Sequence, residues 1–124
     1  MKGEVILSLY APKFDDWFII ETSIGLYSFR LGGIKREIDF EKSKFTTIPC
    51  PFINQTIKAL FTDNFIVYVE TNSGEAIKHS DNASIDGDGN TYFGIFFISK
   101  TEFDEIKFEN SQDPEPHLIE IEVE

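Results

Sequence analysis

The sequence predicts a mainly β fold, or an α+β fold with one or two short helices, arranged as an antiparallel β-sandwich or an open barrel. Aromatic residues make up 15% of the 124 residues, with 13 Phe among them, and aromatic side chains pack well on a pleated sheet. Segments that alternate apolar and polar residues recur along the chain. Turn signals rich in Gly, Asn and Ser separate these segments. The length fits a single domain over residues 1–124.

The first part of the chain is predicted to form a series of strands. Apolar segments at 4–10, 17–21 and 26–31 have the composition of strands. Gly32-Gly33 is a two-residue hairpin signal, because primed turns need positive φ angles. The segment 37–41 then alternates, with its apolar residues facing inward and its acidic residues facing water.

The middle of the chain is predicted to leave the sheet. Pro49 and Pro51 exclude a central strand, because proline cannot donate a ladder hydrogen bond. Asn54 stands where a helix N-cap would stand, and apolar residues follow it at i, i+3 and i+4 spacing. This pattern predicts a short helix over residues 54–62.

The second part returns to strands, at 64–71, 75–79 and 91–99. The segment 91–99 is apolar on both faces, which predicts a strand in the middle of the structure. Ser99 and Glu102 resemble a capping box, so one or two helical turns are expected after residue 99. Residues 117–124 alternate Ile and Val with Glu and predict a last strand. No internal repeat is evident in the sequence.

The segment 84–94, SIDGDGNTYFG, resembles a binding site more than any other stretch. Asp86, Asp88 and Asn90 match the first three ligand positions of an EF-hand loop, but Thr91 and Phe97 stand where that loop needs Gly and Glu. The favoured interpretation is a hairpin loop, because Asp-Gly and Gly-Asn pairs supply positive φ angles. A looser calcium site from Asp86, Asp88 and Asn90 is the weaker alternative.

Residue types that carry chemistry are few, and we expect no catalytic residue, cofactor or structural metal. The chain has two histidines, His79 and His117, and one cysteine, Cys50, which is too few ligands at suitable spacings for a zinc site. Cys50 has no base beside it in the sequence and is predicted to fill apolar space. Trp17 is predicted to be a core or sheet-edge residue.

The strongest signal is charge. The chain carries 22 acidic and 11 basic residues, a formal net charge of −11. Binding to nucleic acid or to anionic membranes depends on basic residues, so both are disfavoured as partners. Residues 101–124 hold nine acidic residues against Lys107 alone, whereas residues 30–44 carry five basic residues against three acids.

This asymmetry predicts one strongly negative face that contacts a basic protein. The residues predicted to bind this partner are Asp81, Asp86, Asp88, Glu102, Asp104, Glu105, Glu109, Glu120 and Glu122. The alternative is a charged edge that keeps the protein in solution and prevents strand pairing.

In size, acidity and lack of catalytic residues the chain resembles the bacterial immunity proteins that neutralise toxic nucleases, including those of contact-dependent growth inhibition systems. The Asp-Gly-Asp-Gly loop before an apolar strand is the local sequence feature that this chain shares with some of these proteins. The resemblance implies a cytoplasmic inhibitor that blocks the active site of a cognate toxin. Inhibitors of host defence encoded by phages share this profile.

Two other classes of function stay open. One is a small-ligand or carbohydrate-binding sandwich, or an enzyme, with a pocket lined by aromatic residues such as Trp17, Tyr27, Tyr68 or Tyr92. The other is a structural or assembly subunit that uses a sheet edge. A single cysteine fits a reducing compartment, and the N-terminal segment has the composition of a strand rather than a signal peptide.

Overall fold

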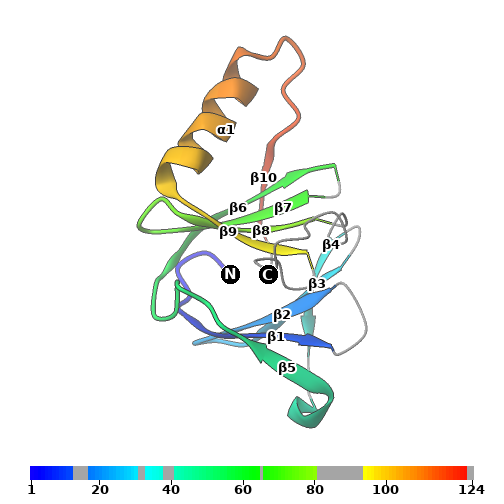
Figure 1. The fold of residues 1–124 in the computed structure, drawn as a ribbon. Helices are drawn as coiled ribbons and strands as arrows, with labels where there is room; N and C mark the ends of the chain where they lie inside the picture. The colour runs from blue at the N-terminus through cyan, green and yellow to red at the C-terminus, as the bar shows by residue number, and fades with distance from the viewer. Residues whose placement is uncertain (13–16, 31–32, 38–40, 65, 81–93, 123–124) are drawn as a thin grey trace.

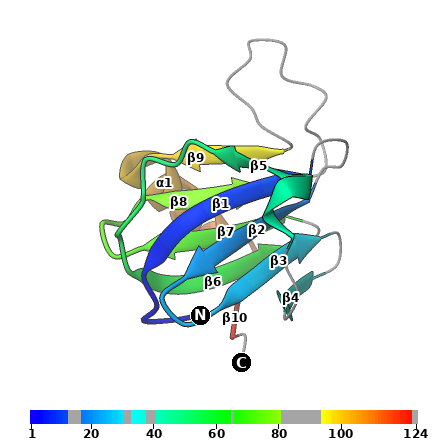
Figure 2. The ribbon, with the colours of Figure 1, turned by 90° about the horizontal axis from the view of Figure 1, so that it is seen from below.

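A computed structural model describes residues 1–12, 17–30, 33–37, 41–64, 66–80 and 94–122. The mainly β prediction is confirmed: the described strands form two antiparallel five-stranded sheets that pack face to face, rather than one closed barrel. Figure 1 shows the two layers with an α-helix outside one of them, and Figure 2 shows the strands of both layers running in similar directions. This is the geometry of an aligned sandwich.

The first sheet has the order β4-β3-β2-β1-β5. Its strands are β1 (Ile6–Pro12), β2 (Phe18–Thr22), β3 (Leu26–Arg30), β4 (Gly33–Glu37) and β5 (Phe45–Ile48), and a 3-10 turn, η1 (Lys42–Lys44), precedes β5. As Pro49 and Pro51 require, β5 ends before them and lies at an edge of the sheet. Arg30 pairs with Gly33, so the predicted hairpin is present but Gly33 belongs to β4 rather than to the turn. Of the predicted strand 37–41, residues 38–40 lie outside the described residues.

The second sheet has the order β10-β6-β7-β8-β9. Its strands are β6 (Ile57–Asp63), β7 (Ile66–Thr71), β8 (Ala76–His79), β9 (Ile95–Ile98) and β10 (Ile119–Ile121), and the helix α1 (Lys100–Gln112) lies between β9 and β10. No helix in the described parts of the chain is both long and apolar enough to cross a membrane.

Two sequence predictions are wrong in the second sheet. Residues 54–62 form a turn and the strand β6 rather than a helix. The strand was not recognised in the sequence because a register shift between Ile57 and Ala59 interrupts its alternation of apolar and polar residues. The strand β9 lies at a sheet edge rather than in the middle. Both of its faces are nonetheless covered, since Phe97 packs against the core between the sheets and Phe96 against a second cluster beneath α1.

The main core fills the space between the two sheets. It contains Phe18, Ile20, Tyr27 and Phe29 from the first sheet, with Leu60 and other apolar residues from the second. The rings of Phe18 and Phe29 stack at a centroid distance of 4.6 Å. A smaller cluster, formed around Tyr68 and Phe103, lies on the outer face of the second sheet.

The two halves of the chain follow one strand plan, although no repeat is evident in the sequence. In each half four strands form a consecutive antiparallel series, and the fifth strand returns to pair with the first. The first strand of each half also has a register shift at its start, between Ile6 and Ser8 in β1 and between Ile57 and Ala59 in β6.

Where the halves meet, two backbone hydrogen bonds correspond to each other, and the corresponding residues are 51 positions apart in the sequence. Gly3 N donates to the carbonyl oxygen of Ile57, and Asn54 N donates to that of Ile6, both at 2.8 Å. The φ angles of Gly3 and Asn54 are 88° and 72°. An antiparallel bridge joins Val5 to its own counterpart, Thr56. The halves are therefore related by an approximate two-fold axis at this bridge.

The repeat extends into the next strands. The dipeptide Glu21-Thr22 ends β2, and Glu70-Thr71 ends β7. In both halves the backbone N–H of the residue after threonine donates to the carbonyl oxygen of the residue just before the first strand: Ser23 N to Val5 O and Asn72 N to Thr56 O, each at 2.9 Å. The halves differ most in the lengths of two connections. The segment before the fifth strand has seven residues (38–44) in the first half and twenty (99–118) in the second, and the segment between the third and fourth strands has two (31–32) and fifteen (80–94).

Candidate partner-binding face

The helix α1 begins where the sequence predicts. The side-chain oxygen of Ser99 accepts a hydrogen bond from the backbone N–H of Glu102 at 3.2 Å, which satisfies one of the free donors of the first turn. The carboxylate of Glu102 also lies at the positive end of the helix dipole. The helix continues to Gln112, well beyond the one or two turns expected from the capping pattern.

One side of α1 packs against the second sheet. Phe103 is fully buried, and its ring centroid lies 5.8 Å from that of Phe61 and 5.4 Å from that of Tyr68. Ile106 adds to this contact one turn further on. Most of the stability of such a helix comes from this packing rather than from helix propensity.

An ion pair fixes how the helix is turned on the sheet. The Lys107 ammonium lies 3.0 Å from a carboxylate oxygen of Glu70, whose side chain is only 4% exposed on β7. The same ammonium lies 4.9 Å from the centroid of the Phe103 ring. A buried carboxylate needs such a partner, so Lys107 is held on the sheet side of α1 and the opposite side faces solvent.

The predicted partner-binding acids on α1 differ in how they are compensated. Asp104 binds Lys100 and lies 3.7 Å from Lys107, and the hydrogen bond from Lys100 lowers the pKa of Asp104. Glu102, Glu105 and Glu109 are exposed, and none of them has an ion-pair partner within 4.0 Å among the described residues. Two of these uncompensated carboxylates, Glu105 and Glu109, lie on the outward side of the helix.

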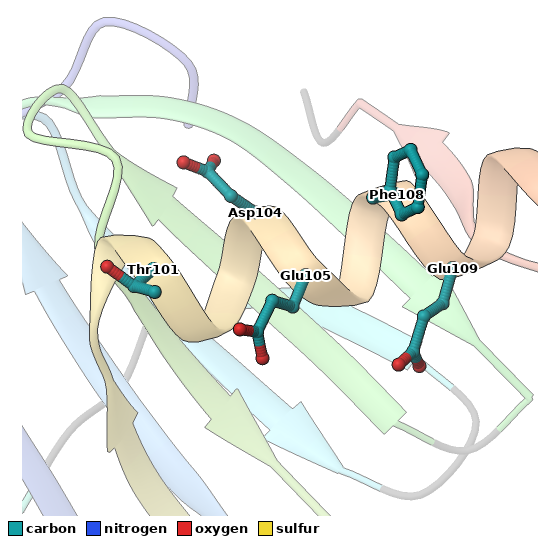
Figure 3. A pocket seen from close by; sticks show the side chains of 5 residues that line it. All are labelled: Thr101, Asp104, Glu105, Phe108 and Glu109. Atoms are coloured by element: carbon teal, nitrogen blue, oxygen red, sulfur yellow. The ribbon is translucent and has the colours of Figure 1, made fainter.

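The outward side of α1 is shown in Figure 3. Asp104 and Phe108 project from one flank of the helix, while Glu105 and Glu109 project from the other. Together with Thr101 they line a shallow hollow of about 320 Å³. Phe108 is 66% exposed. The sequence alone did not indicate Phe108: a longer predicted helix would have placed it three residues from Glu105 on the same side, without showing that this side faces solvent.

The far end of α1 adjoins a second hollow, of about 230 Å³, which shares Glu109 with the first. His117 lies between two carboxylates here, with Nδ1 2.7 Å from Asp63 and Nε2 3.5 Å from Asp113. The side-chain oxygen of Asn110 accepts hydrogen bonds from the backbone N–H groups of His117 and Leu118, both at 3.0 Å. These contacts tie the loop after α1 to the helix and to the end of β6.

The strand β10 brings more acidic residues to the same side. Glu120 pairs with Phe61, which packs beneath α1, so the side chain of Glu120 is on the helix-covered face of the sheet. Glu120 and Glu122 are both exposed. Ile121 packs against the main core as the alternation predicts, whereas Ile119 is 60% exposed.

The remaining acids of the predicted face, Asp81, Asp86 and Asp88, lie outside the described residues. The same holds for Asn90, and so for the calcium alternative. Within the described residues no group of three or more His, Cys, Asp or Glu side chains is arranged to hold a metal ion.

The other candidates from the sequence are placed in packed surroundings. His79 is buried, with its ring centroid 5.0 Å from that of Phe18. Burial raises the pKa of the Cys50 thiol to about 11, so the thiol stays protonated near neutral pH, which is the opposite of a reactive cysteine. Trp17 directly precedes β2, and the central carbon of the Arg30 guanidinium lies 3.8 Å from its ring centroid.

The aromatic pocket suggested for a ligand-binding sandwich is not formed by its described members. Tyr27 is buried in the core between the sheets, and Tyr68 is buried under α1 on the outer face of the second sheet. The second sheet separates these two side chains. Tyr92 lies outside the described residues.

Charge follows the division of the chain into two halves. Residues 1–53 carry seven acidic and seven basic residues, and residues 54–124 carry fifteen acidic and four basic residues. The whole net charge of −11 thus belongs to the half that contains α1. Comparison of the chain with protein-family models, with curated proteins and with solved structures finds no match.

Proposed function

We propose that this chain is a binding protein that neutralises a basic protein partner through the acidic face formed by α1 and β10. In its most specific form, the chain is an immunity protein that blocks the active site of a nuclease-type toxin. Nucleases carry basic clefts that bind phosphate, and an acidic surface can occupy such a cleft in place of the nucleic acid.

The observation that supports this proposal most strongly is a difference between the two similar halves of the chain. Both halves have the same strand plan, but only the second has a long helix between its last two strands. That helix presents Glu105, Glu109 and the exposed Phe108 on its outward side. Packing on the sheet requires Phe103 and Lys107 but none of these three residues.

Complementary charge is the second support. A strongly charged surface raises the rate of encounter with an oppositely charged partner by about 10- to 1,000-fold. An exposed aromatic residue with a polar surround is typical of the centre of a protein interface. The acidic face combines both features within three turns of one helix.

The proposal is tested by co-expression with the products of the genes that flank the gene of this chain. We expect one of these products to be basic, to stop growth when it is produced alone, and to become harmless when this chain is present. Purified proteins should then bind with an affinity that falls steeply with salt. If no flanking product is both toxic and neutralised, the immunity function is wrong.

A matched pair of variants locates the contact. Glu105→Lys changes an exposed glutamate on α1, and Glu41→Lys makes the same change at an exposed glutamate before η1 in the first half. We expect Glu105→Lys to lower the association rate with the neutralised partner about tenfold or more, and Glu41→Lys to leave it within about twofold. Equal effects of the two changes would place the interface elsewhere.

A further inference from the structure

The outward side of α1 has the shape of a groove between two rows of side chains. Residues four positions apart form such rows on a helix surface. Asp104 and Phe108 make one row, Glu105 and Glu109 make the next, and the hollow that they line lies between them. Its volume of about 320 Å³ is at the lower end of the range for small-ligand pockets, which suits a long side chain rather than a whole ligand.

The ring of Phe108 forms a free aromatic wall beside this groove. Phe103, on the same helix, is completely buried against the sheet, whereas Phe108 is 66% exposed. The face of an aromatic ring attracts cations through its quadrupole, and the attraction is strongest for a planar guanidinium that can stack on it. The chain already contains one such stack, between Arg30 and Trp17.

The other wall of the groove carries charge that the helix itself disfavours. Glu105 and Glu109 are four residues apart, a spacing at which like charges repel. Glu109 also lies near the negative end of the helix dipole, and the last turn contains no basic residue. A cation between these two carboxylates would relieve both unfavourable interactions.

We propose that this groove binds an arginine side chain of the partner, with the guanidinium stacked on Phe108 and hydrogen-bonded to Glu105 and Glu109. The inference rests on the proposed function, because it names the residue type by which the basic partner is recognised. Arginine fits better than lysine, since its flat fork of donors can stack on a ring and pair with carboxylates at the same time.

The test uses two short peptides, Ac-Gly-Arg-Gly-Arg-Gly-amide and its lysine analogue, titrated into the 15N-labelled full chain and followed by NMR. We expect the arginine peptide to shift the amides of 101–112 and to bind about 2- to 5-fold more tightly than the lysine peptide. Phe108→Leu keeps an apolar side chain but removes the ring, so the preference for arginine should disappear while the spectrum stays folded.

The charged wall is tested with a matched pair. The double variant Glu105→Gln, Glu109→Gln should lose most of the binding, whereas Glu37→Gln, Glu41→Gln should change it by less than about twofold, because these residues lie in the first half, away from α1. Equal affinity for both peptides, shifts centred outside α1, or no effect of Phe108→Leu would each overturn the arginine site.

These results are independent of the test by co-expression. If the peptides bind at α1 as described but no flanking gene product is neutralised, the arginine site stands and the immunity function fails. If a basic protein is neutralised but the chain shows no preference for arginine, the function stands and the arginine site fails.

Discussion

The two halves of this chain share a strand plan, a register shift and the hydrogen bonds around their common axis, yet they differ in charge and in the segment before their last strand. In the first half seven residues lead into β5, and acidic and basic residues are equal in number. In the second half that segment contains α1, and the whole net charge of −11 belongs to this half of the chain. Because the strand plan needs neither the helix nor the charge, we infer that both serve something other than the sandwich.

The largest expected effect concerns the two phenylalanines of α1. Phe103→Ala removes a fully buried ring from the cluster beneath the helix and should lower the free energy of unfolding by about 3 to 5 kcal/mol. Phe108→Ala removes an exposed ring and should change it by less than about 0.5 kcal/mol. Urea unfolding of both variants measures this. Similar losses for the two would show that Phe108 serves the packing of the helix.

The next effect separates two glutamates at equivalent positions of the halves. In β7, Glu70 is buried and paired with Lys107; in β2, Glu21 accepts a hydrogen bond from the Tyr10 hydroxyl. Lys107→Met leaves Glu70 buried without its cation and should cost about 2 kcal/mol, less than for a fully buried pair because Lys107 is partly exposed. Adding Glu70→Gln should restore most of this loss in thermal or urea unfolding, and no restoration would refute the ion-pair explanation.

A smaller effect concerns pH and the first half. Glu4 of the first half corresponds to Gln55 of the second. Burial acts to raise the pKa of Glu4, but hydrogen bonds from Thr22 and Tyr27 and the nearby amino group of the chain outweigh it and lower that pKa. Burial and the bond to Glu4 raise the pKa of Tyr27.

The lowered pKa of Glu4 gives stability that is present above about pH 4.5 and is lost as the pH falls through the folded value. The raised pKa of Tyr27 gives stability that is present below pH 10.0 and is lost at higher pH. Glu4→Gln introduces the residue type that the second half has at this position, Gln55. It should reduce the loss of unfolding free energy at acid pH by about 1 kcal/mol. Stability curves from pH 2 to 7 for the two proteins check this, and identical acid-side slopes would speak against it.

The smallest effect has the opposite sign. The double variant Glu105→Gln, Glu109→Gln removes a like-charge pair and a carboxylate near the negative helix end, so it should stabilise the protein by about 0.2 to 0.5 kcal/mol. The same variant should bind a basic partner less well. Stability gained while binding is lost would show that these charges serve binding, whereas a destabilised variant would show that they serve the fold.

Much of the sandwich could be predicted from the sequence, because strands with one face toward a core keep a two-residue alternation. The helix predicted over 54–62 fails for a particular reason. The register shift after Ile57 places both Ile57 and Leu60 in the core, and this three-residue spacing imitates a helix. The same irregularity in β1, between Ile6 and Ser8, was hidden within a longer apolar run.

The position of β9 and the internal repeat could not be predicted for different reasons. A run that is apolar on both faces signals burial on both faces, but it cannot distinguish a central strand from an edge strand covered by a helix such as α1. The repeat is visible in backbone hydrogen bonds and in a few residues, such as Glu21-Thr22 and Glu70-Thr71. Elsewhere the side chains of the two halves differ, so the repeat becomes evident only in the folded chain.

The candidate site was predicted in part. Charge counting alone located the acids of residues 102–122, because net charge needs no knowledge of the fold. It could not distinguish Asp104, which two lysines compensate, from Glu105 and Glu109, which carry free charge. It also could not find Phe108, whose exposure depends on which side of α1 packs on the sheet.

A map of the electrostatic potential near each backbone amide tests most directly whether the negative charge lies on one face of the molecule. NMR relaxation by a cationic and by an anionic nitroxide cosolute gives this potential without any partner. We expect the cationic probe to be strongly enriched along α1 and β10, and the two probes to act almost equally along β3, β4 and η1. Equal enrichment of the cationic probe over both halves would contradict the claim that the negative charge is concentrated on one face.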